Sequence, residues 1–149
     1  MGPLDLREHP PRSCYEELDG LMLMPRTIDK LRAQLPGGHP GGYFINGPMP
    51  GISGFLLQRL GIDEAELSEA IAVAGNDDDV AAWLRERVDT ATYPELNETL
   101  RRIRPKHAGN PALFAEIYAE TLAAHPELER IVDVIEADDA RMFPGRTRA

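Results

Sequence analysis

The segment PRTIDKLRAQL, residues 25–35, is the first part of this 149-residue chain that has the pattern of a helix. It opens on a proline, which suits the first position of a helix because no hydrogen bond is lost there. Ile28, Leu31 and Leu35 recur at helical spacing and lie on one face. The sequence Pro-Gly-Gly at 36–38 ends the pattern, so we predict a helix over residues 25–35.

The charged residues of this helix lie away from its apolar face and allow two interpretations. In the first, Arg26 and Lys30 belong to a solvated face, on which Arg26 forms an ion pair with Asp29. In the second, the glycine-rich loop that follows folds over the helix, and Arg26 and Lys30 bind an anionic ligand. Helical periodicity alone favours the solvated face.

The segments on either side of this helix are predicted to be irregular. Residues 1–13 should be extended, because adjacent prolines at positions 10 and 11 restrain the backbone. Residues 36–54 contain seven glycines and four prolines, which is too many for a regular element. Tyr43, Phe44 and Ile45 could form a short strand inside this loop, but no second strand to pair with it is evident.

The rest of the chain is predicted to be helical. Asp63 is a candidate N-cap, as is Asn76 or Asp77, and glycines at 61 and 75 are stop signals. The predicted helices span residues 52–60, 63–75, 76–88, 92–103 and 111–124, and a last helix starts at Glu127. This pattern, without a convincing strand pair, predicts an all-α fold, a compact bundle of about six to seven helices. We expect a single domain over residues 1–149, with residues 143–149 as a flexible tail.

The last predicted helix carries an acidic residue on its apolar face. Its apolar residues are Leu128, Ile131, Val132 and Ile135. If the helix continues past Ile135, Asp139 projects from the middle of that face, where an unpaired carboxylate is costly. Either the helix ends near Ala137 and Asp138 caps a new turn, or Asp139 is buried against an arginine. The candidate partners are Arg12, Arg26 and Arg32.

The net charge of −9 lies entirely on residues 61–100, which hold eleven acidic and two basic residues. An acidic surface repels nucleic acid and anionic lipid, so neither is an expected partner. The same surface would attract a basic protein, which makes residues 61–100 a candidate interaction face. The basic run over residues 101–106 is interpreted as a solvated helix end.

Three further features bear on the location of the protein. No apolar run approaches the ~20 residues that a membrane-spanning helix needs, so we expect no membrane segment. The N-terminus lacks the apolar core of a signal peptide. A single cysteine, Cys14, excludes an internal disulfide and favours a reducing compartment. We therefore expect a soluble cytoplasmic protein, either a monomer or a homo-oligomer.

The sequence predicts no metal site and no cofactor. The four histidines are scattered, and no two of them have metal-ligand spacing. The acidic run at 77–79 lacks the alternating ligands and the closing glutamate of a calcium loop. Residues 46–54 lead into a helix but lack the Lys-Ser/Thr ending of a phosphate-binding loop. Cys14 is interpreted as a small hydrophobic residue rather than a nucleophile.

Several short motifs together resemble one protein family. They are Pro10-Pro11-Arg12-Ser13, Gly20, the block from Pro25 to Ala33, Tyr43, Leu60-Gly61-Ile62-Asp63, Trp83 and Ala137-Asp138-Asp139-Ala140-Arg141. In this combination the chain resembles the bacterial family called domain of unknown function 5069, from about residue 5 to residue 143. It departs from the family pattern at Cys14, at Met24 and in the loop over residues 46–54. The resemblance implies a bacterial cytoplasmic protein and no known reaction.

The charged residues in these motifs lead to a first hypothesis about function, the binding of a small anionic ligand, either a carboxylate or a phosphate. The walls of the pocket would be residues 10–13, the first helix and the last helix. The predicted ligand-binding residues are Arg12, Arg26, Asp29, Lys30, Tyr43, Asp139 and Arg141. Asp139 would orient an arginine or act as a general base. No catalytic residue is predicted, and whether the protein is an enzyme is left open.

The alternative hypothesis is a protein–protein interaction module. In it, the same charges form a buried ion-pair network that holds the N-terminal segment in place. The acidic residues 61–100 would then bind a basic partner. The two hypotheses differ in what the substitution Arg26→Ala would change, ligand binding in the first and stability in the second.

Overall fold

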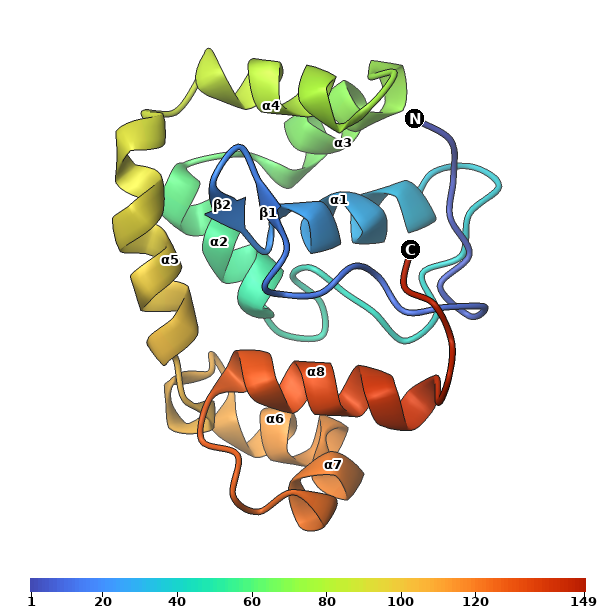
Figure 1. Cartoon of the computed structure of the whole chain (residues 1–149), viewed down its shortest axis with the longest axis vertical. Coiled ribbons are helices and arrows are strands. Elements are labelled where there is room, and N and C mark those ends of the chain that lie inside the picture. Colours follow the sequence, from blue (N-terminus) through green and yellow to red (C-terminus); the bar gives the residue numbers. More distant parts are fainter.

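Eight α-helices make up most of the fold in the computed structural model, which describes residues 1–149 (Figure 1). They are α1 (Met24–Ala33), α2 (Ile52–Leu60), α3 (Glu64–Val73), α4 (Asp77–Arg85), α5 (Tyr93–Arg102), α6 (Pro111–Ile117), α7 (Ala119–Ala124) and α8 (Ile131–Met142). Two single-turn 3-10 helices, η1 (Thr90–Thr92) and η2 (Pro105–His107), precede α5 and α6. The all-α prediction is confirmed, and the chain forms one compact domain.

Side-chain caps begin three of these helices. Asp63 accepts a hydrogen bond from the backbone N–H of Glu66 at the start of α3, and Asn76 accepts one from Asp79 at the start of α4. Each cap satisfies an N–H group that has no partner inside the helix. The predicted cap at Asp63 is therefore confirmed, and of the two candidates Asn76 and Asp77, Asn76 is the cap. Asn110 begins α6 in the same way.

The segment over residues 111–124 is two helices, not the single helix that was predicted. The backbone leaves the helical conformation at Tyr118 (φ −104°, ψ 22°), which ends α6 and begins α7. Tyr118 packs its ring on Phe114, with the ring centroids 4.6 Å apart. Helical spacing alone did not reveal this break, because apolar residues continue on both sides of it.

Helix α8 also differs from the prediction at both ends. It begins at Ile131 rather than Glu127, because the Ile131 N–H donates to the carbonyl of Ile103 and ties the start of α8 to the end of α5. It then continues without interruption to Met142. The interpretation in which the helix ends near Ala137 and Asp138 caps a new turn is therefore wrong.

A small hairpin precedes α1 and was not predicted. Strands β1 (Glu17–Leu18) and β2 (Leu21–Met22) pair antiparallel around the turn Asp19-Gly20, where both residues have positive φ. Asp-Gly is a preferred two-residue hairpin turn because both positions must adopt this conformation. The turn signal was present in the sequence, but strands of two residues are too short to show alternation. The loop over 43–45 contains no strand.

Helix α1 lies at the centre of the molecule. In Figure 1, α3 and α4 lie on one side of it, α8 with α6 and α7 lie on the other, and α5 connects the two ends. Nine of the ten residues of α1 are buried, including Arg26, Asp29 and Lys30. The interpretation of the charged residues as a solvated face is therefore wrong. The apolar face predicted from Ile28 and Leu31 belongs to the main core.

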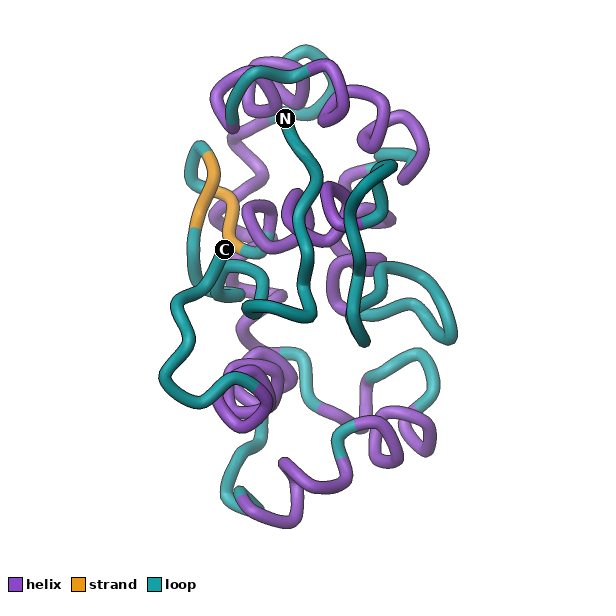
Figure 2. Tube along the Cα trace, turned by 90° about the vertical axis from the view of Figure 1, so that its right-hand side faces the viewer, coloured by secondary structure: helices purple, strands orange, loops and turns teal.

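The N-terminal segment and the glycine-rich loop lie together over the end of α1 (Figures 1 and 2). The Leu6 N–H donates to the carbonyl of His39, and the His39 N–H donates to the carbonyl of Leu4. Residues 143–149, for which we predict a flexible tail, run back along the same segment. There, the Ala149 N–H donates to the carbonyl of Pro10.

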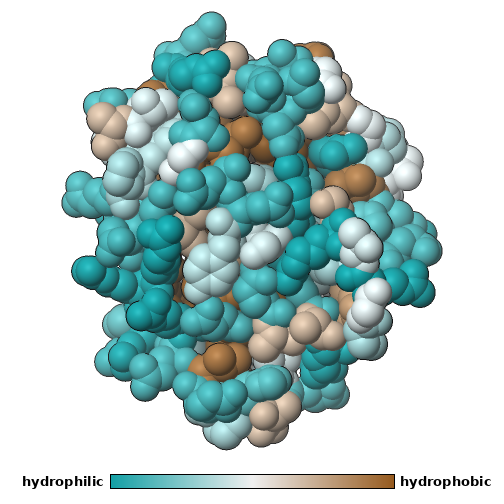
Figure 3. Space-filling view, in the orientation of Figure 1, coloured by the Kyte–Doolittle hydropathy of each residue, from teal (hydrophilic) through white to brown (hydrophobic).

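The surface of the face seen in Figure 1 is mostly hydrophilic, and its hydrophobic atoms form small separate patches (Figure 3). The exposed large hydrophobic residues are Tyr15, Val73, Ile117 and Met142. None of the helices has the length and apolar character that crossing a membrane requires. The basic residues Arg102, Arg104 and Lys106 are exposed, in agreement with the interpretation of residues 101–106 as a solvated helix end.

The substitution Asn97→Ala tests how the hairpin is attached to the core. Buried Asn97 on α5 accepts a hydrogen bond from the Met22 N–H and donates one to the carbonyl of Gly20. The substitution leaves the buried Met22 N–H without a partner, so we expect the free energy of unfolding to fall by about 1–3 kcal/mol in urea titrations. Glu95→Gln, on the exposed side of the same helix, should change it by less than about 0.5 kcal/mol. Equal effects of the two substitutions would contradict this account.

Candidate functional site

The first and last long helices meet through a buried ion pair. Arg26 Nη1 on α1 lies 2.7 Å from Asp139 Oδ2 on α8, and Arg26 Nη2 lies 3.3 Å from Asp139 Oδ1. Only 1% of Arg26 and 2% of Asp139 is exposed. The interpretation of Asp139 as a carboxylate buried against an arginine is therefore confirmed, and Arg26 is the partner among the three candidates.

Asp139 accepts hydrogen bonds from two further side chains. The hydroxyl of Tyr43 lies 2.7 Å from Oδ1, and Arg148 Nη1 lies 2.8 Å from Oδ2. Burial acts to raise the pKa of Asp139, but the charge of Arg26 and the three donors outweigh it and hold this pKa below its ordinary value. Because both carboxylate oxygens are occupied, the geometry favours the predicted role of orienting an arginine over that of a general base.

A second ion-pair cluster joins α1 to the N-terminal segment and to α4. The carboxylate of Asp29 accepts hydrogen bonds from the backbone N–H of Arg12, at 2.8 Å, and from Arg12 Nη2, at 3.0 Å. The other side of the Arg12 guanidinium is paired with Asp77. The predicted Arg26–Asp29 pair does not form, because each residue has a partner on a different segment. Through Arg12, this cluster attaches the N-terminal segment to both helices.

Glu136, one turn before Asp139 on α8, extends the first cluster. It accepts hydrogen bonds from the Ser13 hydroxyl at 2.7 Å and from the Cys14 N–H at 2.6 Å. Arg148 pairs with both Glu136 and Asp139. The C-terminal residues thus contribute a cation that the sequence analysis did not assign to the site.

A polar cavity of about 280 Å³ opens beside the Arg26–Asp139 pair. It lies between α1, the loop around Tyr43, the junction of α6 and α7, and α8. Its polar lining residues are Arg26, Lys30, Tyr43, Tyr118, Asp138 and Arg141. Ile117 and Met142, both partly exposed, also line it, so the cavity lies close to the surface on their side.

Lys30 is the unusual cation of the polar cavity. Its Nζ donates to the carbonyl of Phe44 at 3.1 Å and to the hydroxyl of Ser53 at 3.3 Å, and it forms no ion pair with any carboxylate. The side chain is almost entirely buried. Burial, together with the nearby charge of Arg26, lowers the pKa of Lys30 to about 7. An ammonium group without an anionic partner is therefore enclosed at the wall of a cavity.

The two arginines of the polar cavity are held in different ways. Arg26 places its guanidinium 5.3 Å from the centroid of the Tyr43 ring, and its Nε is buried without a hydrogen-bond partner. Arg141 pairs with Asp138 at 3.1 Å and with the exposed Glu120 at 2.6 Å. Arg26 is thus buried, with its Nε free to donate a hydrogen bond, whereas the side chain of Arg141 is partly exposed to solvent.

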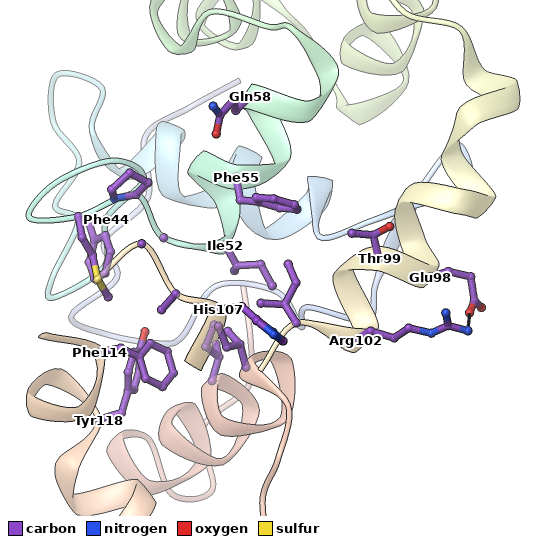
Figure 4. A pocket seen from close by; sticks show the side chains of 18 of the residues that line it. Phe44, Ile52, Phe55, Gln58, Glu98, Thr99, Arg102, His107, Phe114 and Tyr118 are labelled. Atoms are coloured by element: carbon purple, nitrogen blue, oxygen red, sulfur yellow. Dashed lines mark hydrogen bonds and ion pairs between the residues drawn. The ribbon is translucent and has the colours of Figure 1, made fainter. Parts of the chain in front are cut away.

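An apolar cavity of about 690 Å³ adjoins the polar one (Figure 4). Its walls come from α2, α5, α6, α8 and the loop before α2, and ten of its nineteen lining residues are hydrophobic. Five residues line both cavities: Phe44, Gly51, Ile52, Tyr118 and Ile135. The two cavities therefore lie side by side, with part of their walls in common.

The structure divides the seven predicted ligand-binding residues into three groups. Arg26, Lys30, Tyr43 and Arg141 line the polar cavity. Asp139 lies behind Arg26 and fixes it, while Arg12 and Asp29 belong to the second ion-pair cluster and line neither cavity. The grouping follows from the orientation of α1, because residues 26 and 30 lie one turn apart on the cavity side.

Several residues of the site were not predicted from the sequence. Glu136 could have been found, because it lies three residues before Asp139 and hence on the same side of the helix. No sequence pattern indicated the other three residues. Tyr118 lies at a helix break, the Ser53 hydroxyl is buried against Lys30, and Arg148 reaches Asp139 because the C-terminal segment folds back toward α8. No group of three or more His, Cys, Asp and Glu residues is placed to hold a metal ion. Burial raises the pKa of Cys14 to about 11, which fits the interpretation of this residue as a hydrophobic one.

The substitution Asp139→Asn tests the buried ion pair. It removes the carboxylate and leaves Arg26 charged and enclosed, so we expect the free energy of unfolding to fall by about 3–5 kcal/mol in urea titrations. Glu129→Gln makes the same chemical change at an exposed pair with Arg104 and should cost less than about 1 kcal/mol. A loss below about 1 kcal/mol for Asp139→Asn would show that the pair is not enclosed as described.

A pH titration of stability tests the burial of Lys30. The pKa of Lys30 is about 7 in the folded chain, whereas an unfolded chain holds this proton up to about pH 10.4. The unfolded state binds the proton more tightly between these values, so Lys30 makes stability rise with pH by up to about 1.4 kcal/mol per unit. Below about pH 7 both states are protonated and this contribution is flat.

We therefore expect the difference in unfolding free energy between the parent and Lys30→Met to change between pH 7 and 9, in favour of the parent as pH rises. Lys106→Met, at the other lysine of the chain, removes an exposed ammonium and should retain the pH dependence of the parent. If Lys30→Met behaved like Lys106→Met, the ammonium of Lys30 would not be desolvated in the folded protein.

A comparison with known protein families finds a match that includes most residues of the site. The family model for the domain of unknown function DUF5069 matches residues 8–141, which include both ion-pair clusters except for Arg148. Among curated proteins, none matches the chain. Since the match spans most of the sequence and all of the cavity-lining cations, the chain belongs to the family of the domain of unknown function DUF5069.

Proposed function

We propose that the polar cavity binds a small anionic ligand through a carboxylate or phosphate group. The observation that carries the proposal is Lys30, a buried ammonium that has only two neutral acceptors and no carboxylate partner. Enclosing an unpaired charge is costly, and an anion in the cavity would supply the missing partner. Burial and the nearby charge of Arg26 lower the pKa of Lys30 to about 7, and an anion beside the ammonium would act in the opposite direction.

Arg26 supports the proposal as a second donor. Its two terminal nitrogens are occupied by Asp139, but the buried Nε has no partner. Charge-assisted hydrogen bonds to an anion are among the strongest polar interactions in proteins. Because Asp139 and Tyr43 hold the guanidinium in place, Arg26 would lose little side-chain freedom when a ligand binds.

Arg141 is suited to the entry of the ligand rather than to its final position. It lines the polar cavity, its side chain is 39% exposed, and it is paired with acids on two helices. An anion that enters would replace Glu120, the exposed partner of Arg141, which changes the energy little because such surface pairs are weak. Arg12 and Asp29 are assigned a structural role, in contrast to the first hypothesis.

The alternative function, binding of a basic protein, rests on the exposed acids of α3 and α4. Glu66, Glu69, Asp78 and Asp79 are exposed on this pair of helices, which pack against each other. Charges of one sign on a surface speed the encounter with an oppositely charged partner. This surface lies away from the polar cavity (Figure 1), so the two functions do not exclude each other.

Titration with butyrate and with inorganic phosphate, followed by NMR chemical shifts, tests the proposed function. We expect saturable shifts at residues around the polar cavity in the parent protein. In Lys30→Met, the loss of a charge-assisted hydrogen bond should weaken binding by about 10-fold or more. Lys106→Met is the matched control and should bind like the parent.

Two outcomes would contradict the proposal. One is that neither anion produces saturable shifts. The other is that Lys30→Met, with its fold shown intact by melting, binds both anions as tightly as the parent.

A further inference from the structure

We infer that the ligand is an amphipathic monocarboxylate, whose carboxylate pairs with Lys30 in the polar cavity and whose alkyl tail occupies the apolar cavity. This inference rests on the proposed function and names the class of ligand. The observation that carries it is the contact between the two cavities, which share five lining residues. The polar cavity can hold the charged group of a ligand, and the apolar cavity beside it can hold a hydrocarbon chain.

The walls of the apolar cavity favour hydrocarbon over water. Phe55 and Ile52 project into it from α2, and Phe114 lines it from α6 (Figure 4). Hydrophobic residues make up ten of the nineteen that line this cavity, and the displacement of water from apolar walls by an apolar group is favourable. A volume of about 690 Å³ lies within the range of pockets that hold small ligands.

The charges of the apolar cavity indicate which way such a ligand would lie. Arg102 is paired with Glu98 at 3.1 Å, at the edge of the cavity opposite Phe44 and Tyr118 (Figure 4). This pair leaves no unpartnered cation at that edge. The unpartnered cation is Lys30, beyond Phe44, so the charged end of the ligand points toward the polar cavity.

Tyr118 provides a polar group at the boundary between the cavities. It lines both of them, and its hydroxyl forms no hydrogen bond within the chain. The break between α6 and α7 occurs at this residue and sets the position of its ring against Phe114. A carboxylate that lies against Lys30 would offer an acceptor to this hydroxyl.

The charge balance favours a carboxylate over a phosphate. Three cations line the polar cavity, and two of them, Arg26 and Arg141, already have acidic partners. Lys30 alone lacks one, so the cavity has room for one negative charge. A phosphate with close to two charges would leave part of its charge unpaired in a buried place.

A series of unbranched carboxylates from butyrate to decanoate, titrated into the intact protein by calorimetry, tests the inference. If the tail enters the apolar cavity, affinity should rise about fourfold per added methylene until the cavity is filled. Octanol and octylammonium have the same tail as octanoate but lack its negative charge, and both should bind at least 10-fold more weakly.

A substitution that fills the apolar cavity separates the tail from the head group. Thr99 lines this cavity from α5, on the side opposite Phe44 and Tyr118 (Figure 4), and does not line the polar cavity. Thr99→Phe should reduce the affinity for octanoate to that for butyrate and leave butyrate binding unchanged. Thr99→Val keeps the size of the side chain and serves as the matched control.

The outcomes distinguish this inference from the proposed function. Equal affinity for butyrate and octanoate would overturn the inference while the proposed function stands. Binding of octanol as tightly as octanoate, unaffected by Lys30→Met, would overturn the inference, as would no binding of any carboxylate. The proposed function would fall as well only if inorganic phosphate also failed to bind.

Discussion

The buried ion pair between Arg26 and Asp139 is the interaction on which the other parts of the structure converge. A charge enclosed in protein must be matched by an opposite charge and by hydrogen bonds, since unpaired burial is strongly unfavourable. Asp139 meets this requirement with donors from α1, from the loop at Tyr43 and from the C-terminal Arg148. Arg26 in turn donates to the carbonyl of Arg12. One pair therefore fixes the relative positions of two helices and three irregular segments.

The same requirement explains why a central helix can carry so many charges. Asp29 faces the N-terminal segment and is matched by Arg12, while Arg26 faces α8 and is matched by Asp139. Lys30 is the exception, because the groups around it are a backbone carbonyl and a serine hydroxyl. Arg32, which is only partly buried, donates to the carbonyl of Gly2. Among the buried charges of this helix, Lys30 alone lacks an oppositely charged partner, and an unmatched ammonium at a cavity wall is the feature that most favours a ligand.

The two cavities arise from the way the second half of the chain packs. Helices α6 and α7 form a separate pair below α8, and their junction at Tyr118 turns an aromatic ring toward the glycine-rich loop (Figure 1). The loop brings Phe44 to the opposite side of the boundary. Gly51 fits closely there, because a Cβ at this position would lie 3.0 Å from the ring of Phe44. Aromatic groups from two distant segments thus lie at the boundary between the polar and the apolar cavity.

Local patterns in the sequence were sufficient for the positions of helices α2, α3, α4 and α5, whose caps, stop signals and apolar spacing act within a few residues. The caps at Asp63 and Asn76 and the span of α2 were predicted in this way. The position of Asp139 on the apolar face of its helix also indicated an arginine partner, because a buried carboxylate requires an opposite charge or hydrogen-bond donors. The choice of Arg26 as that partner, the return of Arg148 and the break at Tyr118 depend on contacts between residues far apart in the chain. No local pattern encodes such contacts, so the cavities and the isolated charge of Lys30 became visible only when the segments were packed together.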